Sequence, residues 1–382
     1  MAWTTSPRRA ESMSGGWRDR TLLDLLTEHG LELSPEHAFP TDGWSGATFT
    51  GLVDPVGRHF VLKRTSLGTD WIARATGDDE LREGWLAARP TAEMAWLPRT
   101  SIAYLGAAAD GDGVAILMPD LSTELIAWER PGHDPVIDDP TLRRVVESVA
   151  RLHAMPWSRV LESTAEHDDE PMPPWCPLPE RLTLLTRRSA AAYAEDGNPV
   201  GPRFLAGWDA FERRAPEAAR ELVDRLGENP APLVSALARL PAVGLHGDLK
   251  LANVALLPED RVGFIDWQMT MRAPLAVDLG WFLVSNSGSL PAPPETIVTE
   301  YRQALEWDSG RWGFPGEAHD FSGLTGDWNT QLDLTWIIGL LLRGWRKGLD
   351  AEAGLTLASG MSAAEDLAWW CARAVEAADR RL

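Results

Sequence analysis

Three oxygen-bearing side chains in residues 245–283 have the types and the spacing needed for chemistry on a phosphate. Asp248 is followed five residues later by Asn253, which begins a short β-favouring run. After a turn, a second apolar run ends directly before Asp266. Two short runs around a turn predict a β-hairpin over 254–265. Such a hairpin brings Asn253, at its start, beside Asp266, at its end.

These side chains suit transfer of a phosphoryl group. Asn253 and Asp266 offer the oxygen ligands that Mg²⁺ prefers. Asp248, on a loop just before them, could accept a proton from a hydroxyl nucleophile. Positioning, a base and a metal that neutralises charge are what phosphoryl transfer requires. The alternative is that all three are ordinary turn residues.

The ordered motifs of this stretch resemble the aminoglycoside phosphotransferase family, a group of small-molecule kinases within the protein-kinase-like superfamily. The matching motifs are His246-Gly247-Asp248-Leu249-Lys250-x-x-Asn253, Ile265-Asp266-Trp267 and Asp278-Leu279-Gly280. The resemblance implies that Asp248 is the catalytic base and that Asn253 and Asp266 bind the metal. It also implies that Asp278 supports the catalytic loop. Lys250 would help to balance charge on the transferred group.

The composition excludes several classes of partner. The chain has 382 residues and a formal net charge of −20, so nucleic acid and anionic membranes are not expected partners. Its two cysteines match no metal or redox spacing and are expected to be free thiols in the cytoplasm. Residues 1–20 lack a signal-peptide core and are expected to be disordered. The apolar run 334–342 is too short to span a bilayer, which takes about 20 residues.

The N-terminal third reads as a short helix followed by strands. The helix is predicted over 20–29, and the first three strands over 38–41, 47–53 and 59–66. Kinases cover the nucleotide phosphates with a glycine-containing hairpin, and the resemblance makes Gly43 and Gly46 the candidates here. A plain turn is the alternative for this Gly-x-x-Gly pattern.

Lys63 ends a Phe-Val-Leu-Lys run that resembles the kinase strand whose lysine positions the nucleotide phosphates. The alternative is an exposed lysine on a half-buried strand. A helix predicted over 78–89 would supply its glutamate partner. The family's Arg-Glu pattern favours Glu83, and Glu80, one turn earlier, is the rival.

Two further strands are predicted over 101–108 and 114–118. The second leads into a segment that resembles the connector between the two lobes of this family. Backbone groups near Met118 would meet the adenine edge, although Pro119 has no N–H to donate.

The rest of the chain is predicted to be mainly helical. Apolar spacing predicts a helix over 141–155, where His153 lies on the apolar stripe and is expected to be a packed core residue. Asp278 is predicted to open a helix, with N-capping as its alternative role. The other helices are predicted over 179–195, 203–226 with a break at Pro216, 232–239, 294–306, 329–347 and 362–381.

The implied fold is α+β with two protein-kinase-like lobes. A nucleotide-binding N-lobe, 21–118, holds an antiparallel sheet and a helix. A mainly helical C-lobe, 119–382, holds the catalytic loop, the metal site and the acceptor site. ATP and Mg²⁺ are the implied cofactors.

The predicted function is transfer of the γ-phosphoryl group of ATP to a hydroxyl of a small molecule. The alternatives are an idle nucleotide-binding scaffold and, less in keeping with the short spacing from Asp266 to Asp278, a protein kinase. The net charge and two acidic loops, 166–170 and 317–327, predict a cationic acceptor, such as an aminoglycoside, another antibiotic or an amino sugar. Solubility is the alternative explanation for the acidity.

Overall fold

The computed structural model describes residues 16–32, 37–38, 44–88, 100–126, 136–155, 157, 174–309 and 321–382. Its strands are β1 (His37–Ala38), β2 (Thr48–Val53), β3 (His59–Thr65), β4 (Thr100–Ile102), β5 (Gly106–Asp110), β6 (Gly113–Pro119), β7 (Val243–Leu245), β8 (Val254–Leu257), β9 (Arg261–Phe264) and β10 (Met271–Ala273). Its α-helices are α1 (Leu22–Glu28), α2 (Trp71–Ala75), α3 (Arg82–Ala87), α5 (Asp139–Ala154), α7 (Leu178–Thr183), α8 (Arg187–Glu195), α9 (Val200–Arg214), α10 (Glu217–Glu228), α11 (Ala231–Leu237), α12 (Ala276–Ser285), α13 (Pro294–Ser309), α14 (Phe321–Thr325), α15 (Trp328–Glu352) and α16 (Ala363–Arg381).

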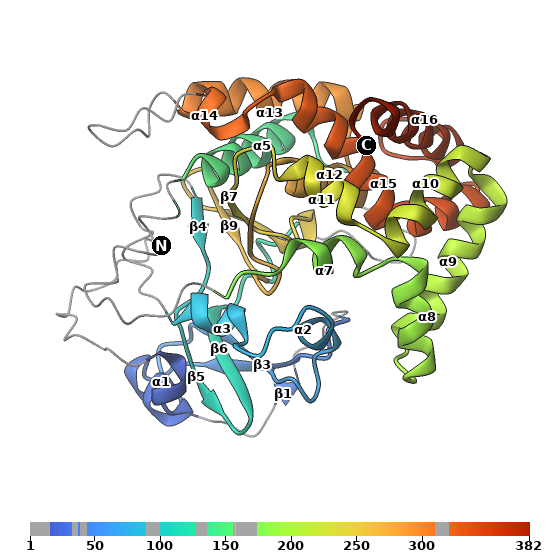
Figure 1. Ribbon diagram of the computed structural model, residues 1–382. Coiled ribbons are helices and arrows are strands. Elements are labelled where there is room, and N and C mark those ends of the chain that lie inside the picture. Colours follow the sequence, from blue (N-terminus) through green and yellow to red (C-terminus); the bar gives the residue numbers. More distant parts are fainter. Residues whose placement is uncertain are drawn as a thin grey trace.

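A five-stranded sheet in the order β1-β2-β3-β6-β5 forms the N-lobe together with α1, α2 and α3 (Figure 1). Successive side chains of a strand point to opposite faces, so β3 contributes to two packing surfaces. Phe60 and Leu62 pack in a small core with residues of α1. Val61 belongs to the main core on the other face. Lys63 has the same parity as Val61 and therefore points away from α1, toward the rest of the molecule.

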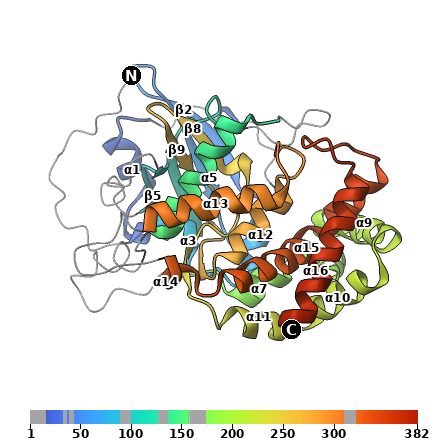
Figure 2. The same ribbon diagram turned by 90° about the horizontal axis from the view of Figure 1, so that it is seen from above.

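The remaining helices form the C-lobe. Seen from above, α13 runs beside α5 and α12, and α15 lies beside α16 (Figure 2). The apolar run 334–342 forms the middle of α15, where all of its residues are buried. None of the helices in the described part of the chain has the length and the apolar character that crossing a bilayer demands.

The predicted fold class is confirmed: a small antiparallel sheet is followed by a mostly helical lobe. The hairpin of β8 and β9 is antiparallel and pairs Val254 with Phe264. The predicted break at Pro216 separates α9 from α10. Helices α1, α5, α13, α15 and α16 lie close to their predicted ranges.

Several predicted elements need correction. The helix expected over 78–89 begins only at Arg82, because Asp78 and the positive φ of Leu81 (50°) hold a turn before it. The separate helix α2 was not predicted. The helix expected over 179–195 is two helices, α7 and α8, and the acidic loop expected over 317–327 contains α14. Part of the stretch expected to be disordered is ordered, since residues 17–19 form a 3₁₀ turn with Trp17 buried.

The strand expected over 101–108 is also two strands, and they belong to different sheets. β4 pairs in parallel with β9 of the C-lobe hairpin, whereas β5 pairs with β6 of the N-lobe sheet. The three residues between β4 and β5, 103–105, therefore cross from one lobe to the other.

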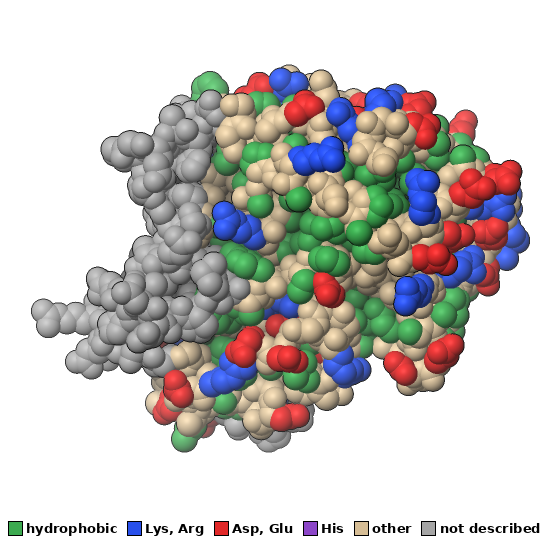
Figure 3. Space-filling view, in the orientation of Figure 1, with side chains coloured by type: hydrophobic (Ala, Val, Ile, Leu, Met, Phe, Trp, Pro, Cys, Tyr) green, Lys and Arg blue, Asp and Glu red, His purple; other side chains and the backbone are tan. Residues whose placement is uncertain are grey.

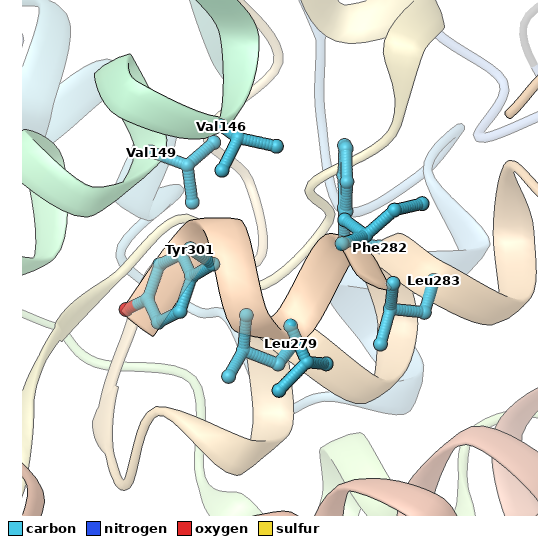
Figure 4. Close-up of a pocket in the computed structure, with 8 residues that line it drawn as sticks. Val146, Val149, Leu279, Phe282, Leu283 and Tyr301 are labelled. Carbon is cyan, nitrogen blue, oxygen red and sulfur yellow. The ribbon is translucent and has the colours of Figure 1, made fainter. Parts of the chain in front are cut away.

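A small apolar cavity lies between α5, α12 and α13, bordered by the ring of Tyr301 (Figure 4). Its volume is about 10 Å³, which is room for at most about one water molecule. It is lined by Val146, Val149, Leu279, Phe282, Leu283, Ile297, Val298 and Tyr301. This cavity is a gap in core packing and is too small for a metabolite.

Candidate active site

The loop after β7 carries the predicted catalytic base. Gly247 has a φ of +79°, and a Cβ there would lie 1.8 Å from the carbonyl oxygen of Met269. Only glycine fits this position, because any side chain would collide with backbone. The loop can therefore pass close to the segment that follows β9, which places Asp248 near the hairpin of β8 and β9.

Asp278 binds the backbone of this loop through hydrogen bonds. Its two carboxylate oxygens accept hydrogen bonds from the backbone N–H groups of His246 (2.9 Å) and Gly247 (2.8 Å). Asp278 lies in the first turn of α12 and does not cap it, so the capping alternative is wrong. Burial opposes ionisation of this carboxyl, but a hydrogen bond from His153 and the nearby rings of His153 and His246 lower its pKa.

His153 belongs to the support of the loop. It is fully buried, with Nε2 3.1 Å from Asp278 Oδ2 and Nδ1 2.7 Å from the hydroxyl of Tyr301. The prediction of a packed, hydrogen-bonded histidine is confirmed. The chain Tyr301–His153–Asp278 thus fixes the backbone on the N-terminal side of Asp248.

Asp248 lies between two polar partners. Asn253 Nδ2 donates to the backbone oxygen of Asp248 (2.9 Å) and to its Oδ2 (3.2 Å). Lys250 Nζ lies 3.0 Å from the same Oδ2. The side chain of Asp248 is 13% exposed, so its carboxylate is oriented by the loop and still reachable.

Asp266 follows β9 in a strained conformation. Its φ is +64°, which costs a residue with a Cβ about 1–2 kcal/mol. Lys63 Nζ donates to Asp266 Oδ1 at 2.7 Å and to Glu83 Oε2 at 2.6 Å. Burial opposes ionisation of Asp266, but Lys63 and Lys250 outweigh it and lower the pKa to about 2. Asp266 is therefore a carboxylate at neutral pH.

Lys63 is not the exposed lysine of the alternative interpretation, because only 3% of its side chain is exposed. Burial by itself lowers its pKa, but Asp266 and Glu83 raise it above the ordinary value. Its glutamate partner is Glu83, whereas the rival Glu80 forms an exposed ion pair with Arg18. The structure thus joins a lysine of β3, a glutamate of α3 and the predicted metal ligand.

The two predicted glycines of the nucleotide loop have different outcomes. Gly43 lies outside the described residues. Gly46 has a φ of +97°, and a Cβ there would lie 2.2 Å from the carbonyl oxygen of Thr69. The loop is tied down beside it, since the Trp71 indole N–H donates to the Trp44 carbonyl at 2.7 Å. Gly46 therefore permits a close approach of the backbone to Thr69, and its predicted contact with the nucleotide phosphates stays a prediction.

Met118 lies at the end of β6 and is almost fully buried. Its register partner across the sheet is Val61, two residues before Lys63. This position is at the edge where the two lobes meet. Its predicted contact with adenine stays a prediction.

Three residues that sequence reasoning missed also contact the site. Tyr104 donates to Glu83 and accepts from the backbone N–H of Trp267 (3.1 Å). Arg82 Nη1 donates to the carbonyl of Gln268 (3.0 Å). Arg181, on α7, donates from Nε to the carbonyl of Gly247 (2.8 Å). The Arg-Glu pattern of α3 could have pointed to Arg82, but neither Tyr104 nor Arg181 lies in a recognisable motif.

The residues fit a divalent cation bound together with a nucleotide. Asn253 commits its amide nitrogen to Asp248, which leaves the amide oxygen for a metal. Asp266 is an ionised carboxylate close by in the fold, because the N–H of Ile265 bonds to the carbonyl of Asn253 (3.1 Å). In the described part of the chain no group of three or more acidic, histidine or cysteine side chains forms a metal cage. Magnesium sites often use only one or two carboxylates together with substrate phosphates.

Comparisons with known proteins point to one family. The family model described as the phosphotransferase enzyme family (APH) matches residues 39–313. No curated protein sequence is similar enough to be matched to the chain.

Solved structures that match over most of the chain include several small-molecule kinases. Macrolide 2'-phosphotransferase MphH from Brachybacterium faecium is 18% identical, with 92% of this chain and 96% of that chain covered and a TM-score of 0.40. Choline kinase LicA from Streptococcus pneumoniae is 12% identical, with 93% and 96% covered and a TM-score of 0.44. The amicoumacin kinase hAmiN, in complex with AMP-PNP, Ca²⁺ and Ami, is 12% identical, with 93% and 92% covered and a TM-score of 0.46.

Proposed function

Because the chain belongs to the phosphotransferase enzyme family, we propose that it transfers the γ-phosphoryl group of ATP to a hydroxyl group of a small molecule. The family match spans the catalytic loop and the hairpin, and it confirms the resemblance seen in residues 246–280. The identity of the acceptor and the use of ATP and Mg²⁺ are parts of the proposal.

One observation carries this proposal. Lys63 from the N-lobe sheet reaches the carboxylate of Asp266 in the C-lobe, while Asn253 reaches Asp248. The proposed nucleotide-orienting lysine, two metal ligands and base come from three separate segments, namely β3, the loop 246–253 and the residues after β9. This convergence supports an active phosphotransferase over an idle scaffold. The proposed lysine, base and metal ligands are all present, and the ionised Asp266 bonds to Lys63.

The chemistry follows from the position of these groups. Asp248 takes the proton of the acceptor hydroxyl, whose oxygen forms a bond to the γ-phosphorus of ATP. The bond between that phosphorus and the β–γ bridging oxygen breaks, and ADP leaves with the electron pair. Lys250 lies beside Asp248 and balances negative charge on the transferred group. Asn253 keeps the Asp248 carboxylate turned toward the hydroxyl.

A Mg²⁺ ion held by Asn253 Oδ1 and the Asp266 carboxylate would neutralise charge on the nucleotide phosphates. Lys63 orients the same phosphates from the N-lobe side, and Glu83 orients Lys63. Gly46 allows the loop backbone to approach the phosphates closely.

The acceptor is proposed to be a small molecule with a hydroxyl and, at a distance from that hydroxyl, a positive charge. Two cations already interact with the base, since Arg181 and Lys250 both act on Asp248. A cationic group of the acceptor must therefore bind farther away. The predicted acidic loop 166–170 and residues 317–320 lie outside the described residues, and Asp327 caps α15.

A substrate screen tests the proposal. The full chain is incubated with ATP, Mg²⁺ and separate hydroxylated compounds: aminoglycosides, macrolides, choline, amino sugars and neutral polyols. ADP release is followed by mass spectrometry of each compound that stimulates it. The proposal predicts a phosphorylated acceptor in amounts equal to the ADP formed. Binding of MgATP without phosphorylation of any compound, together with unchanged ADP release, would favour the idle scaffold.

A further inference from the structure

Tyr104 lies at the point where the chain crosses from one lobe to the other. It follows β4, whose neighbour Ala103 donates its N–H to the carbonyl of Phe264 in β9 (3.2 Å). The next residue, Leu105, bonds to Leu117 of the N-lobe sheet (2.8 Å). Tyr104 is thus held by backbone contacts to both lobes, and only 2% of it is exposed.

The hydroxyl of Tyr104 makes two hydrogen bonds of opposite sense. It donates to Glu83 Oε1 and accepts the backbone N–H of Trp267 at 3.1 Å. A tyrosine hydroxyl has one proton to donate and lone pairs to accept, so both capacities are used. Burial and the adjacent Glu83 carboxyl raise the pKa of Tyr104 well above its ordinary value, which keeps the donated proton on the hydroxyl.

The two partners of this hydroxyl belong to different parts of the proposed site. Glu83 Oε2 holds Lys63, so the bond to Oε1 fixes the other half of the carboxylate. Trp267 directly follows Asp266, whose φ of +64° needs support from its surroundings. The N–H of Trp267 is the first backbone donor after that strained residue, and Tyr104 is its partner.

Each of the three residues 266–268 is held by a contact of its own. Lys63 holds the Asp266 side chain, Tyr104 holds the Trp267 backbone, and Arg82 holds the Gln268 carbonyl. Lys63 and Arg82 are cations that other residues of the site also bind. Tyr104 contributes one neutral hydroxyl, which bonds both to Glu83, the partner of Lys63, and to the backbone N–H of Trp267.

We propose that Tyr104 is a positioning residue that couples the Lys63–Glu83 pair to the Asp266 loop, so that the phosphate-orienting lysine and the metal-binding carboxylate are set together. This inference rests on the proposed function, because it assigns Tyr104 a role in binding the metal–nucleotide complex. Tyr104 does not touch the reacting atoms. Tyr104 acts by fixing the positions of the Glu83 and Asp266 carboxylates.

The test is the variant Tyr104→Phe in the full chain, which removes one hydroxyl and keeps the ring. The matched control is Tyr193→Phe, which removes a hydroxyl that donates to the Leu184 carbonyl at 3.0 Å and keeps the ring that packs against Trp71. Affinities for ATP are measured by titration calorimetry with Mg²⁺ and, separately, with EDTA. We expect Tyr104→Phe to weaken MgATP binding roughly tenfold, because a buried donor and a buried carboxylate lose a partner. ATP binding in EDTA should change much less, and Tyr193→Phe should bind like the wild type.

Amide hydrogen exchange separates a local effect at Trp267 from a loss of overall stability, because global unfolding would also speed exchange in peptides far from the site. In the wild-type chain, the amide of Trp267 should exchange slowly, because it is buried and bonded to Tyr104. In Tyr104→Phe, overlapping peptides that resolve Trp267 should exchange faster, while peptides from α16 should be unchanged.

The outcomes separate the two levels of the proposal. If the wild-type chain binds MgATP and Tyr104→Phe binds it equally well, the role of Tyr104 is wrong and the phosphotransferase proposal stands. If Tyr104→Phe weakens ATP binding equally with Mg²⁺ and with EDTA, the role of Tyr104 is only structural and the inference is wrong. Fast exchange of Trp267 in the folded wild type would also overturn the inference. A wild-type chain without affinity for MgATP would overturn the proposed function and this inference with it.

Discussion

Asp248 and Asp266 are held in the site by different kinds of contact. Asp248 is oriented by neighbours in its own loop, through the amide of Asn253 and the ammonium of Lys250. Asp266 is held from the other lobe by Lys63, in a backbone conformation with positive φ. The first arrangement suits a base that must remain near a mobile hydroxyl. The second suits a ligand whose direction must not change.

Replacing Asp266 by alanine should abolish metal-dependent nucleotide binding. The change removes the principal carboxylate for Mg²⁺ and leaves Lys63 with Glu83 alone. Mutations of residues that merely support a metal ligand cost about 10–100-fold in metal affinity, so loss of the ligand should cost at least as much. MgATP affinity is measured by calorimetry across a series of Mg²⁺ concentrations.

The matched control is Asp260→Ala, in the turn of the same hairpin, where the aspartate also has a positive φ (56°). Asp260→Ala should bind MgATP like the wild type. Unchanged MgATP affinity in Asp266→Ala would remove Asp266 from the metal site.

Single residues of the site were predictable where they belong to an ordered motif. Asp248, Asn253 and Asp266 could be found because their spacing along the chain already implies the loop and the hairpin. Tyr104 and Arg181 could not be found, because neither lies in a motif and each bonds to a backbone group of the site: the N–H of Trp267 and the carbonyl of Gly247. A backbone partner leaves no mark in the sequence.

At the scale of elements, the described residues just before β2 make a close approach to Thr69 at Gly46. Gly46→Ala should weaken MgATP binding, because its Cβ would meet the Thr69 carbonyl at 2.2 Å and push the loop away from the phosphates. Gly57→Ala is the control: it shares a positive φ (84°) but has no atom within 4 Å of its new Cβ. Both variants should lose about 1–2 kcal/mol of stability from the left-handed backbone.

MgATP affinity by calorimetry should therefore separate these glycine variants. A tenfold or greater loss, by rough estimate for a displaced backbone contact, is expected for Gly46→Ala only. Equal affinities in the two variants would make Gly46 an ordinary turn residue, as the alternative interpretation of the sequence had it.

The turn before α3 should make stability depend on pH. Burial raises the pKa of Asp78 to about 6, although Arg82 opposes this. The folded chain then holds this proton more tightly than the unfolded chain, whose aspartate has the ordinary value of 3.8. The free energy of unfolding therefore falls as pH rises from about 4 through about 6, by roughly 2–3 kcal/mol in all.

Asp78→Asn removes this titration. Melting temperatures of the wild type and Asp78→Asn are measured by scanning calorimetry. As pH rises from about 4 through about 6, the melting temperature of the wild type should fall relative to that of Asp78→Asn. Above about pH 7 the difference should be constant. A difference that does not vary between these values of pH would show that Asp78 titrates normally.

Elements with a clear period were predicted well, and those defined by tertiary contacts were not. α5 has apolar residues at helical spacing, and its observed range differs from the predicted one by two residues at its start and one at its end. β4 has only three residues and exists because β9 pairs with it. The sequence there continues smoothly into β5, so no local signal marks the change of sheet. The start of α3 was missed because Leu81 adopts a positive φ that its side chain does not favour.

At the scale of the whole molecule, the net charge of −20 is not concentrated on the face seen in Figure 3. On the face seen in Figure 3, acidic and basic side chains are interspersed across the surface. Mixed charges of this kind favour solubility. Attraction of a cationic acceptor then requires a local concentration of acidic groups at the site.

Salt dependence tests that attraction. Raising the salt concentration should increase KM for a cationic acceptor, because screening shortens the field to about 10 Å at 0.1 M. The KM for a neutral acceptor should change little. Neutralising Glu166, Asp168, Asp169 and Glu170 should raise the acceptor's KM much more than the KM for ATP. Substrates that are all neutral polyols, with KM insensitive to salt, would remove the cationic preference and leave the phosphotransferase proposal intact.

The two-lobed architecture was predictable because the motifs occur along the chain in an order that implies it. The contacts between the lobes were not, since Arg82 reaches the carbonyls of Pro174 and Gln268 across 92 and 186 residues. These long-range bonds fix how the lobes meet and so complete the site.

The most direct test of the central claim compares the wild-type chain with Asp248→Asn. Both are given ATP, Mg²⁺ and an acceptor found in the screen, and phosphorylated acceptor is measured by mass spectrometry over time. The amide keeps the shape of Asp248 but cannot take the hydroxyl proton, so the rate should fall about 10²–10⁴-fold while MgATP binding and melting temperature stay near those of the wild type. Transfer by Asp248→Asn at the wild-type rate would contradict the account.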